Sequence, residues 1–178
     1  MIVRVPASSA NLGSGFDCLG IAWQLYNEIE FQPAASLSIR GCEERFCGPD
    51  NLAFRGFSAV YEGAGLPVPG AEIRFQSCRI PISRGLGSSA ALIAAGAAAA
   101  NALGGFRLSR EQLLTVCTGV EGHPDNLAPA IFGGFTAAAA ENGRAVCAEY
   151  PLSPRLRFLT AVPGFELSTA HRLGHSAI

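Results

Sequence analysis

The sequence predicts an α+β domain with a large apolar core. Segments that alternate apolar and polar residues, as strands do, occur among segments whose apolar residues recur at helical spacing, and the two kinds follow no regular βαβ order. The 178 residues are enough for one full domain and the beginning of another. Because 49% of the residues are apolar and only 15% are charged, disorder is not expected.

Strand patterns dominate the first part of the chain. Residues 2–5 alternate as a short strand, and the Gly- and Ser-rich segment 6–20 that follows is expected to be a loop. Residues 22–31 and 36–40 also have strand character, with a turn at Pro33 between them.

The first predicted helix covers residues 51–62. It follows Pro49-Asp50, a plausible helix start, and its apolar side chains recur at helical spacing: Leu52, Phe54, Phe57, Val60 and Tyr61. A loop over 63–69 and an alternating strand over 71–77 are expected next.

Two more helices and a hairpin are predicted in the second half. A long helix over 88–103 ends at a Gly-Gly pair, and Ser109 with Gln112 makes a capping-box start for a helix that is expected to reach Val116. The strand-like segments 131–140 and 145–150 flank an Asn-Gly turn, which is a strong hairpin signal. One more strand is predicted over 156–162.

The basic residues exclude several classes of enzyme. The chain has no lysine, so all 13 of its basic residues are arginine. A Walker A loop, a pyridoxal phosphate enzyme and a protein kinase each need a lysine in the active site. These three classes are therefore excluded.

Charge and apolar pattern bear on partners and location. The net charge of −1, without a basic stripe, argues against a nucleic-acid partner. The apolar run 90–103 is shorter than the ~20 residues that span a bilayer, so no membrane partner is expected. The six cysteines show no metal-site spacing, and with no export signal visible the thiols are expected to be free in a cytoplasmic protein.

Residues 81–91, PISRGLGSSAA, form a Gly-rich turn that leads into the long helix. Gly85 and Gly87 allow the backbone to approach a ligand closely, and the first turn of the helix offers N–H groups to an anion, most often phosphate. The alternative is a plain helix entry capped by Ser88. A dinucleotide-binding loop also fits G-x-G-x-x-A, but the spacing from the preceding strand and the lack of a following acidic strand end argue against it.

These residues carry a resemblance to a known family. P-I-S-R-G-L-G-S-S-A-A is similar to the phosphate-binding motif P-x-x-x-G-L-G-S-S-A-A of the GHMP kinases, small-molecule kinases whose loop wraps the triphosphate of ATP without a P-loop lysine. Two further stretches, VPASSANLGSGFDCLGIA (5–22) and EGHPDNLAPAIFGG (121–134), resemble the patterns of the homoserine kinase branch. The resemblance covers residues 5–134 and extends loosely to about 169.

The resemblance implies phosphoryl transfer from Mg-ATP to the side-chain hydroxyl of L-homoserine, giving O-phospho-L-homoserine for threonine biosynthesis. Ser89 and Glu121 are expected to hold Mg²⁺. The residues implied to bind ATP are Pro81, Ile82, Ser83, Arg84, Gly85, Leu86, Gly87, Ser88, Ser89, Ala90 and Ala91, with Asn51 near the adenine. The alternative for Asn51 is a helix cap, and for Glu121 a solvent-facing carboxylate at a helix end.

The acceptor side is implied by the same motifs. Asp17 suits the substrate ammonium group, and Asn11, His123 and Thr169 are expected to contribute polar contacts. The catalytic residues are expected to be Glu121 with Asn126 or Asp125, one of which orients the attacking hydroxyl. Either the Asp125 carboxylate or the γ-phosphate itself could take the proton. Without the resemblance, His123 reads as a loop histidine, and Asp125-Asn126 as a helix cap.

The resemblance also implies a fold and a division of the chain. Residues 1–163 are expected to be the GHMP kinase amino-terminal domain, of the ribosomal protein S5 domain 2-like type. Residues 164–178 are expected to be the truncated start of a ferredoxin-like carboxy-terminal domain that is otherwise absent. The arginine after Thr169 stands one residue early relative to the family's T-x-x-x-R, which puts the tail's match in doubt.

Two expectations and two alternatives follow from the resemblance. A chain without the second domain is expected to be weak or inactive, because one wall of the cleft would be missing. Family members often form homodimers, so a homodimer is expected. The alternatives are another GHMP kinase, such as a mevalonate-type enzyme, and a nucleotide-binding domain without catalysis.

Overall fold

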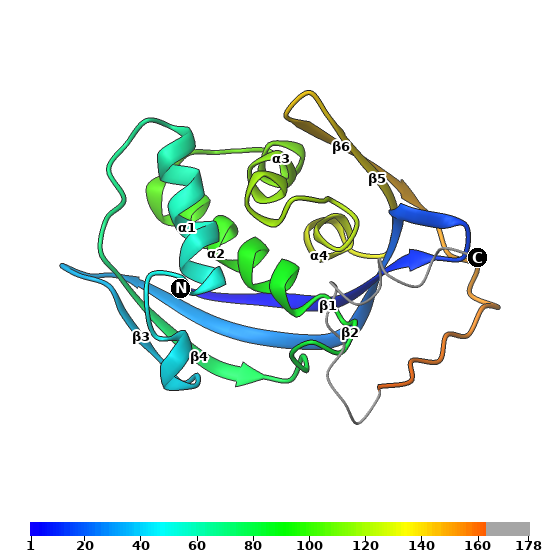
Figure 1. Ribbon diagram of the computed structural model, residues 1–178, viewed down its shortest axis with the longest axis horizontal. Coiled ribbons are helices and arrows are strands. Elements are labelled where there is room, and N and C mark those ends of the chain that lie inside the picture. Colours follow the sequence, from blue (N-terminus) through cyan, green and yellow to red (C-terminus); the bar gives the residue numbers. More distant parts are fainter. Residues whose placement is uncertain (163–178) are drawn as a thin grey trace, which may run out of the picture.

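The computed structural model describes residues 1–162. Its helices lie together over one face of a twisted sheet, and a hairpin at one end of the sheet rises beside them (Figure 1). The strands are β1 (Ile2–Leu12), β2 (Gly15–Pro33), β3 (Ser38–Arg40), β4 (Ala71–Cys78), β5 (Phe135–Glu141) and β6 (Arg144–Tyr150). The helices are α1 (Leu52–Gly63), α2 (Ser88–Gly104), α3 (Arg110–Glu121), α4 (Leu127–Phe132) and the short 3-10 turn η1 (Glu44–Phe46). The predicted α+β class is confirmed.

The long strand β2 organises the sheet. Its second half pairs with β4 and its first half with β5, both antiparallel, and β1 runs antiparallel along it. The order is β3-β4-β2-β5-β6, in which only β3 and β4 are parallel. Strands that lie far apart in the sequence thus meet on β2.

The prediction of a loop over 6–20 is wrong. These residues continue β1, turn after Leu12 and return as the first part of β2, with Ser8 opposite Ala22 and Leu12 opposite Gly15. The many glycines and serines hid the strand pattern, but their backbone groups still pair. Asn11 and Asp17 have positive φ angles of 60° and 53°, which makes the ladder irregular near the turn.

The predicted helices are confirmed, with changes in extent. Asn51 caps α1 by accepting hydrogen bonds from the N–H groups of Ala53 and Phe54. The capping box of Ser109 and Gln112 is present at the start of α3, which continues to Glu121, well beyond the expected end. The segment after the predicted end has few large apolar residues, yet it lies in the same helix.

Helices α1 and α2 pack at very close range. A Cβ atom on Gly56 would collide with the carbonyl oxygen of Ile93, and one on Gly96 would collide with that of Ala53. The alanines of α2 are buried in the same contact and in the adjoining core, Ala97, Ala99 and Ala100 all at 0% exposure. Small residues therefore let the two helix backbones touch, which fixes the direction in which α2 begins.

The end of the described chain departs from two predictions. The first part of the predicted strand 131–140 belongs to α4 instead, and β5 begins only at Phe135. The strand predicted over 156–162 does not form: this segment is exposed and has no regular secondary structure, and no described strand pairs with it. Phe158 meets Trp23 edge to face at 6.1 Å between ring centroids, so a ring contact stands where a ladder was expected.

The described elements bear on two other predictions. No helix among residues 1–162 combines the length and apolar character needed to cross a bilayer. The predicted domain boundary between residues 163 and 164, and Thr169 beyond it, lie outside the described residues.

Candidate active site

The Gly-rich loop enters α2 through left-handed backbone conformations. Gly85 and Gly87 have φ angles of 73° and 63°, and Gly87 is the N-cap, not Ser88. The first bond of the helix runs from the N–H of Ala91 to the carbonyl oxygen of Gly87, at 2.9 Å. The N–H groups of the three preceding residues therefore point out of the helix end, together with the positive end of its dipole. This geometry suits an anion.

Strand β1 holds the loop in place. The N–H of Ser8 donates to the carbonyl oxygen of Leu86 at 3.1 Å, and the hydroxyl of Ser9 donates to that of Gly85 at 3.2 Å. Trp23 Nε1 donates to Ser9 Oγ at 2.9 Å. Leu86 itself is 3% exposed and anchors the loop in the core. The sequence alone predicts no role for either serine; their place beside Asn11 in S-S-A-N is the signal that could have found them.

The stretch 121–134 also contacts β1 and the Gly-rich loop. Ser8 Oγ donates to Asn126 Oδ1 at 3.1 Å, and a Cβ atom on Gly87 would lie 2.9 Å from this same oxygen while colliding with Ser8 Oγ. Gly20 of β2 is equally close to the 121–126 segment, since a Cβ there would collide with the carbonyl oxygen of Asp125. Three stretches far apart in sequence thus converge within hydrogen-bond distance.

Asp125 is the buried centre of this cluster, with 1% of its surface exposed. Its Oδ1 accepts from the N–H of Asn126 at 2.7 Å and lies 2.7 Å from His123 Nδ1, and its Oδ2 accepts from Asn11 Nδ2 at 3.4 Å. Both carboxylate oxygens therefore have partners. This arrangement suits a residue that positions three neighbours better than one that collects a proton from a substrate.

His123 connects the cluster to solvent. Its side chain is 43% exposed, and its pKa is raised, chiefly by the hydrogen bond to Asp125 and further by the charges of Asp125, Glu121 and Asp17 against the opposing effect of burial. With Nδ1 held by Asp125, Nε2 is the ring nitrogen left for a ligand.

Asn11 and Asp17 lie together at the irregular end of the β1–β2 hairpin. Asn11 Oδ1 accepts from the N–H of Asp17 at 2.7 Å, while its Nδ2 reaches Asp125. The charge of Asp17 also contributes to the raised pKa of His123, so the exposed carboxylate lies near that ring. The structure therefore brings together the three described residues that the sequence predicts for substrate binding.

Ser89 and Glu121, the two residues predicted to hold Mg²⁺, are in contact. Ser89, in the first turn of α2, donates its hydroxyl proton to Glu121 Oε1 at the last residue of α3. Burial raises the pKa of Glu121, although the bond to Ser89 and the charges of His123 and Arg55 oppose this. A carboxylate and a hydroxyl beside an anion site fit Mg²⁺, which takes few protein ligands and completes its shell with phosphate and water. Groups of three or more His, Cys, Asp or Glu side chains in metal-binding geometry do not occur in residues 1–162.

Asn51 is engaged in the fold. It is 6% exposed, caps α1 with Oδ1, and donates from Nδ2 to the carbonyl oxygen of Phe46 at 2.8 Å. The cap that the sequence offered as one alternative is therefore confirmed, and the contact with adenine stays a prediction. In the loop, Ile82 is 51% exposed and Ser83 has a φ of 55°, whereas Ala90 and Ala91 are fully buried and can contribute only backbone.

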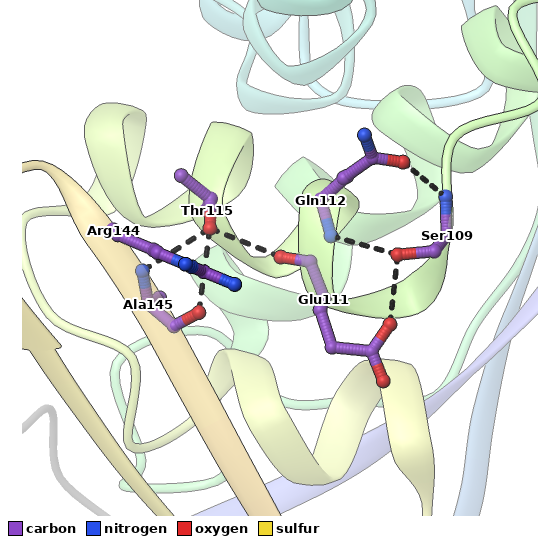
Figure 2. A pocket seen from close by; sticks show the side chains of 6 residues that line it. All are labelled: Ser109, Glu111, Gln112, Thr115, Arg144 and Ala145. Atoms are coloured by element: carbon purple, nitrogen blue, oxygen red, sulfur yellow. Dashed lines mark hydrogen bonds between the residues drawn. The ribbon is translucent and has the colours of Figure 1, made fainter.

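A separate cavity of about 330 Å³ lies between α3 and β6 (Figure 2). Ser109, Glu111, Gln112, Thr115, Arg144 and Ala145 line it. Thr115 Oγ1 accepts from the N–H of Ala145 at 3.1 Å and donates to the carbonyl oxygen of Glu111 at 3.0 Å, which ties the hairpin to the helix (Figure 2). None of the predicted site residues lines this cavity.

The fold and the cluster define a class of protein. Residues 51–134 match the family described as GHMP kinases N terminal domain. This chain therefore carries a GHMP kinase N-terminal domain, and the family predicted from the motifs is confirmed.

Its relatives narrow the class. Over 168 residues the chain is 42% and 43% identical to the homoserine kinases of two Clostridium botulinum strains, which covers 94% of this chain and 56% of each relative. Among solved structures, one assigned as a homoserine kinase from Listeria monocytogenes is 30% identical with a TM-score of 0.73, covering 90% of this chain and 61% of that one. Mevalonate kinase of Methanococcus jannaschii, at 16% identity and a TM-score of 0.64 over 85% and 56% of the two chains, shares the fold. The chain thus spans little more than half the length of the curated relatives that it matches.

Proposed function

We propose that this protein phosphorylates L-homoserine: the γ-phosphoryl group of ATP passes to the side-chain hydroxyl, giving ADP and O-phospho-L-homoserine for threonine biosynthesis in the cytoplasm. The similarity to homoserine kinases supports this substrate. The observation that carries the proposal is the convergence of the Gly-rich loop, the β1–β2 hairpin and the 121–126 segment at Asn126 Oδ1.

On the nucleotide side, the loop from Pro81 to Ala91 would bind the phosphates through the N–H groups at the start of α2. Ser89 and Glu121 would hold Mg²⁺, which when bound neutralises charge on the phosphate oxygens. Asn51 would lie at the adenine edge through its backbone, because its side chain is used in the cap. In such transfers the protein contributes mainly positioning and charge, which is what an array of helix-end N–H groups supplies.

On the acceptor side, the exposed Asp17 would pair with the substrate ammonium group, with Asn11 and His123 Nε2 as polar contacts. Asn126, fixed by Ser8, would orient the attacking hydroxyl. As the oxygen attacks the γ-phosphorus, the bond to the bridging oxygen of ADP breaks. The hydroxyl proton would pass to the transferred phosphoryl group, because Asp125 is buried and its carboxylate is held by three hydrogen-bonding neighbours.

An assay of ADP release tests the proposal. Because the chain spans 56% of its curated relatives, it is assayed alone and also joined to the remaining part of a Clostridium botulinum homoserine kinase. The extended protein is expected to release ADP with Mg-ATP only when L-homoserine is present, and mevalonate should not replace it. Weak or no release is expected from the chain alone.

Two results would contradict the proposal. Release that depends on mevalonate would indicate another GHMP kinase, and Mg-dependent ATP binding without turnover on any acceptor would indicate a binding domain. Sedimentation of the extended protein tests the predicted homodimer separately. Proteolysis of the chain alone tests whether residues 1–163 are a domain separate from 164–178, as proposed.

A further inference from the structure

Two thiols face each other at the start of α1. Cys42 and Cys47 frame the sequence CEERFC, and their Sγ atoms are 3.6 Å apart. Both are free and only partly buried. The active-site cluster does not use them.

The local fold places them together. β3 ends at Arg40, and the 3-10 turn η1 then reverses the chain, with the N–H of Phe46 donating to the carbonyl oxygen of Glu43 at 2.9 Å and that of Cys47 to Glu44 at 3.0 Å. The Cys47 thiol also lies 3.6 Å from the carbonyl oxygen of Glu43. The turn therefore holds the thiols in contact without a covalent bond.

We propose that Cys42 and Cys47 form a reversible disulfide by exchange with a low-molecular-weight disulfide. A disulfide bond is about 2 Å long, so the two sulfur atoms, which lie 3.6 Å apart, must move closer to each other. Rotation of the two side chains can bring them together. In a reducing compartment the pair stays as two thiols, and it closes when the thiol–disulfide balance becomes oxidising.

The exchange balances with the small disulfide as the only oxidant. One cysteine thiolate attacks a sulfur of the small disulfide, forms a mixed disulfide and releases one small thiolate, which takes up a proton. The second cysteine thiolate then attacks the protein sulfur of the mixed disulfide and releases the other small thiolate. Two cysteine thiols are oxidised to one disulfide, and the small disulfide is reduced to two thiols.

The disulfide would act on the start of α1. The carbonyl oxygen of Phe46, inside the six-residue ring, accepts from Asn51 Nδ2 at 2.8 Å, and Asn51 caps the helix through Ala53 and Phe54. A closed ring holds this oxygen in place. The amides of Ala53 and Phe54 should therefore exchange with solvent more slowly in the oxidised chain.

Cys42 must lose its proton at one of the two steps of this exchange. Burial raises its pKa to about 11, with further contributions from Cys47 and Cys78. Little of this thiol is ionised near neutral pH, and only the thiolate attacks. The reaction should therefore accelerate as the pH rises. Because Cys78 also lies near Cys42, it is the competitor that the experiment must separate.

Tryptic mapping after treatment with oxidised glutathione provides the test. Cleavage after Arg40, Arg45 and Arg55 releases Cys42 in peptide 41–45 and Cys47 in peptide 46–55, while Cys78 lies in peptide 75–79. The expected product is the 41–45 peptide joined to 46–55, with a loss of two hydrogen atoms from the intact chain at these two cysteines. Dithiothreitol should reverse it.

Matched variants complete the test. Cys47→Ser should abolish the cross-link and leave a glutathione adduct on Cys42, whereas Cys147→Ser should not affect it; Cys147 is also partly buried, with a pKa raised to about 11. A cross-link of 41–45 to 75–79, stable glutathione adducts on both Cys42 and Cys47, or no reaction at either thiol would each overturn the proposal. Unchanged amide exchange at Ala53 and Phe54 in the cross-linked chain would overturn the effect on α1.

Discussion

His123 Nδ1 lies 2.7 Å from Oδ1 of Asp125, and the same oxygen accepts the N–H of Asn126. One buried carboxylate oxygen therefore sets both the ring that faces the proposed acceptor and the backbone of the residue proposed to orient its hydroxyl. The other oxygen reaches Asn11 on the β1–β2 hairpin. Asp125 therefore joins two parts of the candidate site that lie 114 positions apart in the sequence.

The variant Asp125→Asn tests this role. An amide can accept from His123 and Asn126 with its oxygen, but its NH₂ group would then face the NH₂ group of Asn11. We expect a loss of about 1–3 kcal/mol in the free energy of unfolding and a fall in the pKa of His123 toward its ordinary value. NMR titration of the His123 ring protons measures the pKa. An unchanged pKa would show that Asp125 does not hold the ring.

The raised pKa of His123 also predicts how stability depends on pH. Because the folded protein binds this proton more tightly than the unfolded chain, the protonated ring stabilises the fold. The contribution should be complete below the ordinary pKa of 6.5 and disappear as the pH rises through the raised folded value. It should not exceed about 1 kcal/mol, because the ring is partly exposed and screened by solvent.

Urea unfolding of the native chain and of His123→Gln, from about pH 5 to about pH 9, isolates this contribution. The difference in free energy between the two proteins should shrink with rising pH. A difference that grows with pH would contradict the ion pair.

Gly87 is expected to tolerate no side chain. It has a φ of 63°, and a Cβ atom would collide with Ser8 Oγ and press on Asn126 Oδ1. Gly87→Ala should therefore cost about 2–4 kcal/mol from the combined strain and collision. Gly13→Ala is the matched control, since Gly13 has a φ of 61° with open space around it. It should lose only about 1 kcal/mol, the strain alone. Equal losses in the two variants, measured by urea unfolding, would mean that the loop does not press on β1.

The parts of the molecule that could be predicted from sequence are those that depend on local signals. The capping box at Ser109, the Asn51 cap and the Asn-Gly turn each fix an element through residues a few positions apart. The β1–β2 hairpin over 6–20 could not be seen, because its Gly- and Ser-rich strands carry no alternation and gain their order from partners on the opposite strand. The failed strand over 156–162 is the reverse case, a strand-like pattern without a described strand beside it.

Some residues of the candidate site could be predicted from the sequence, and others could not. Motif letters indicated Asn11, Asp17, Ser89, Glu121 and His123, and the structure brings these residues into two adjoining contacts. The burial of a residue bears on its role in the site, and burial of a single residue cannot be predicted from a motif. In sequence Asp125 is a possible base; its burial and its hydrogen bonds to three neighbours are the reasons for which we propose a positioning role. Ser8 was not singled out, because its hydrogen bond spans 118 positions of the chain.

Glu121 is expected to govern the dependence on Mg²⁺. Its pKa is raised by burial, so protons should compete with the cation at a higher pH than they would at an exposed glutamate. Glu121→Gln should weaken Mg-dependent ATP binding at least about tenfold, since the charge on the ligand is lost. Glu62→Gln, an exposed glutamate on α1, is the control and should bind normally. Calorimetric titration of Mg-ATP at two pH values measures both effects, and equal affinity in Glu121→Gln and the native chain would remove Glu121 from the proposed metal site.

Asn51 allows the cap and the nucleotide role to be separated. Asn51→Ala removes the acceptor for the N–H groups of Ala53 and Phe54 and the donor to Phe46, so it should cost about 1–2 kcal/mol in urea unfolding. Asn51→Asp keeps the cap oxygen and adds a favourable negative charge at the N-terminus of α1, but its second carboxylate oxygen would face the carbonyl oxygen of Phe46, so it should recover only part of that loss. If Asn51 contacts ATP only through its backbone, Asn51→Asp should also bind Mg-ATP about as tightly as the native chain. A clear loss of ATP affinity in Asn51→Asp, measured under conditions where the variant is fully folded, would instead place the side chain itself in the nucleotide site.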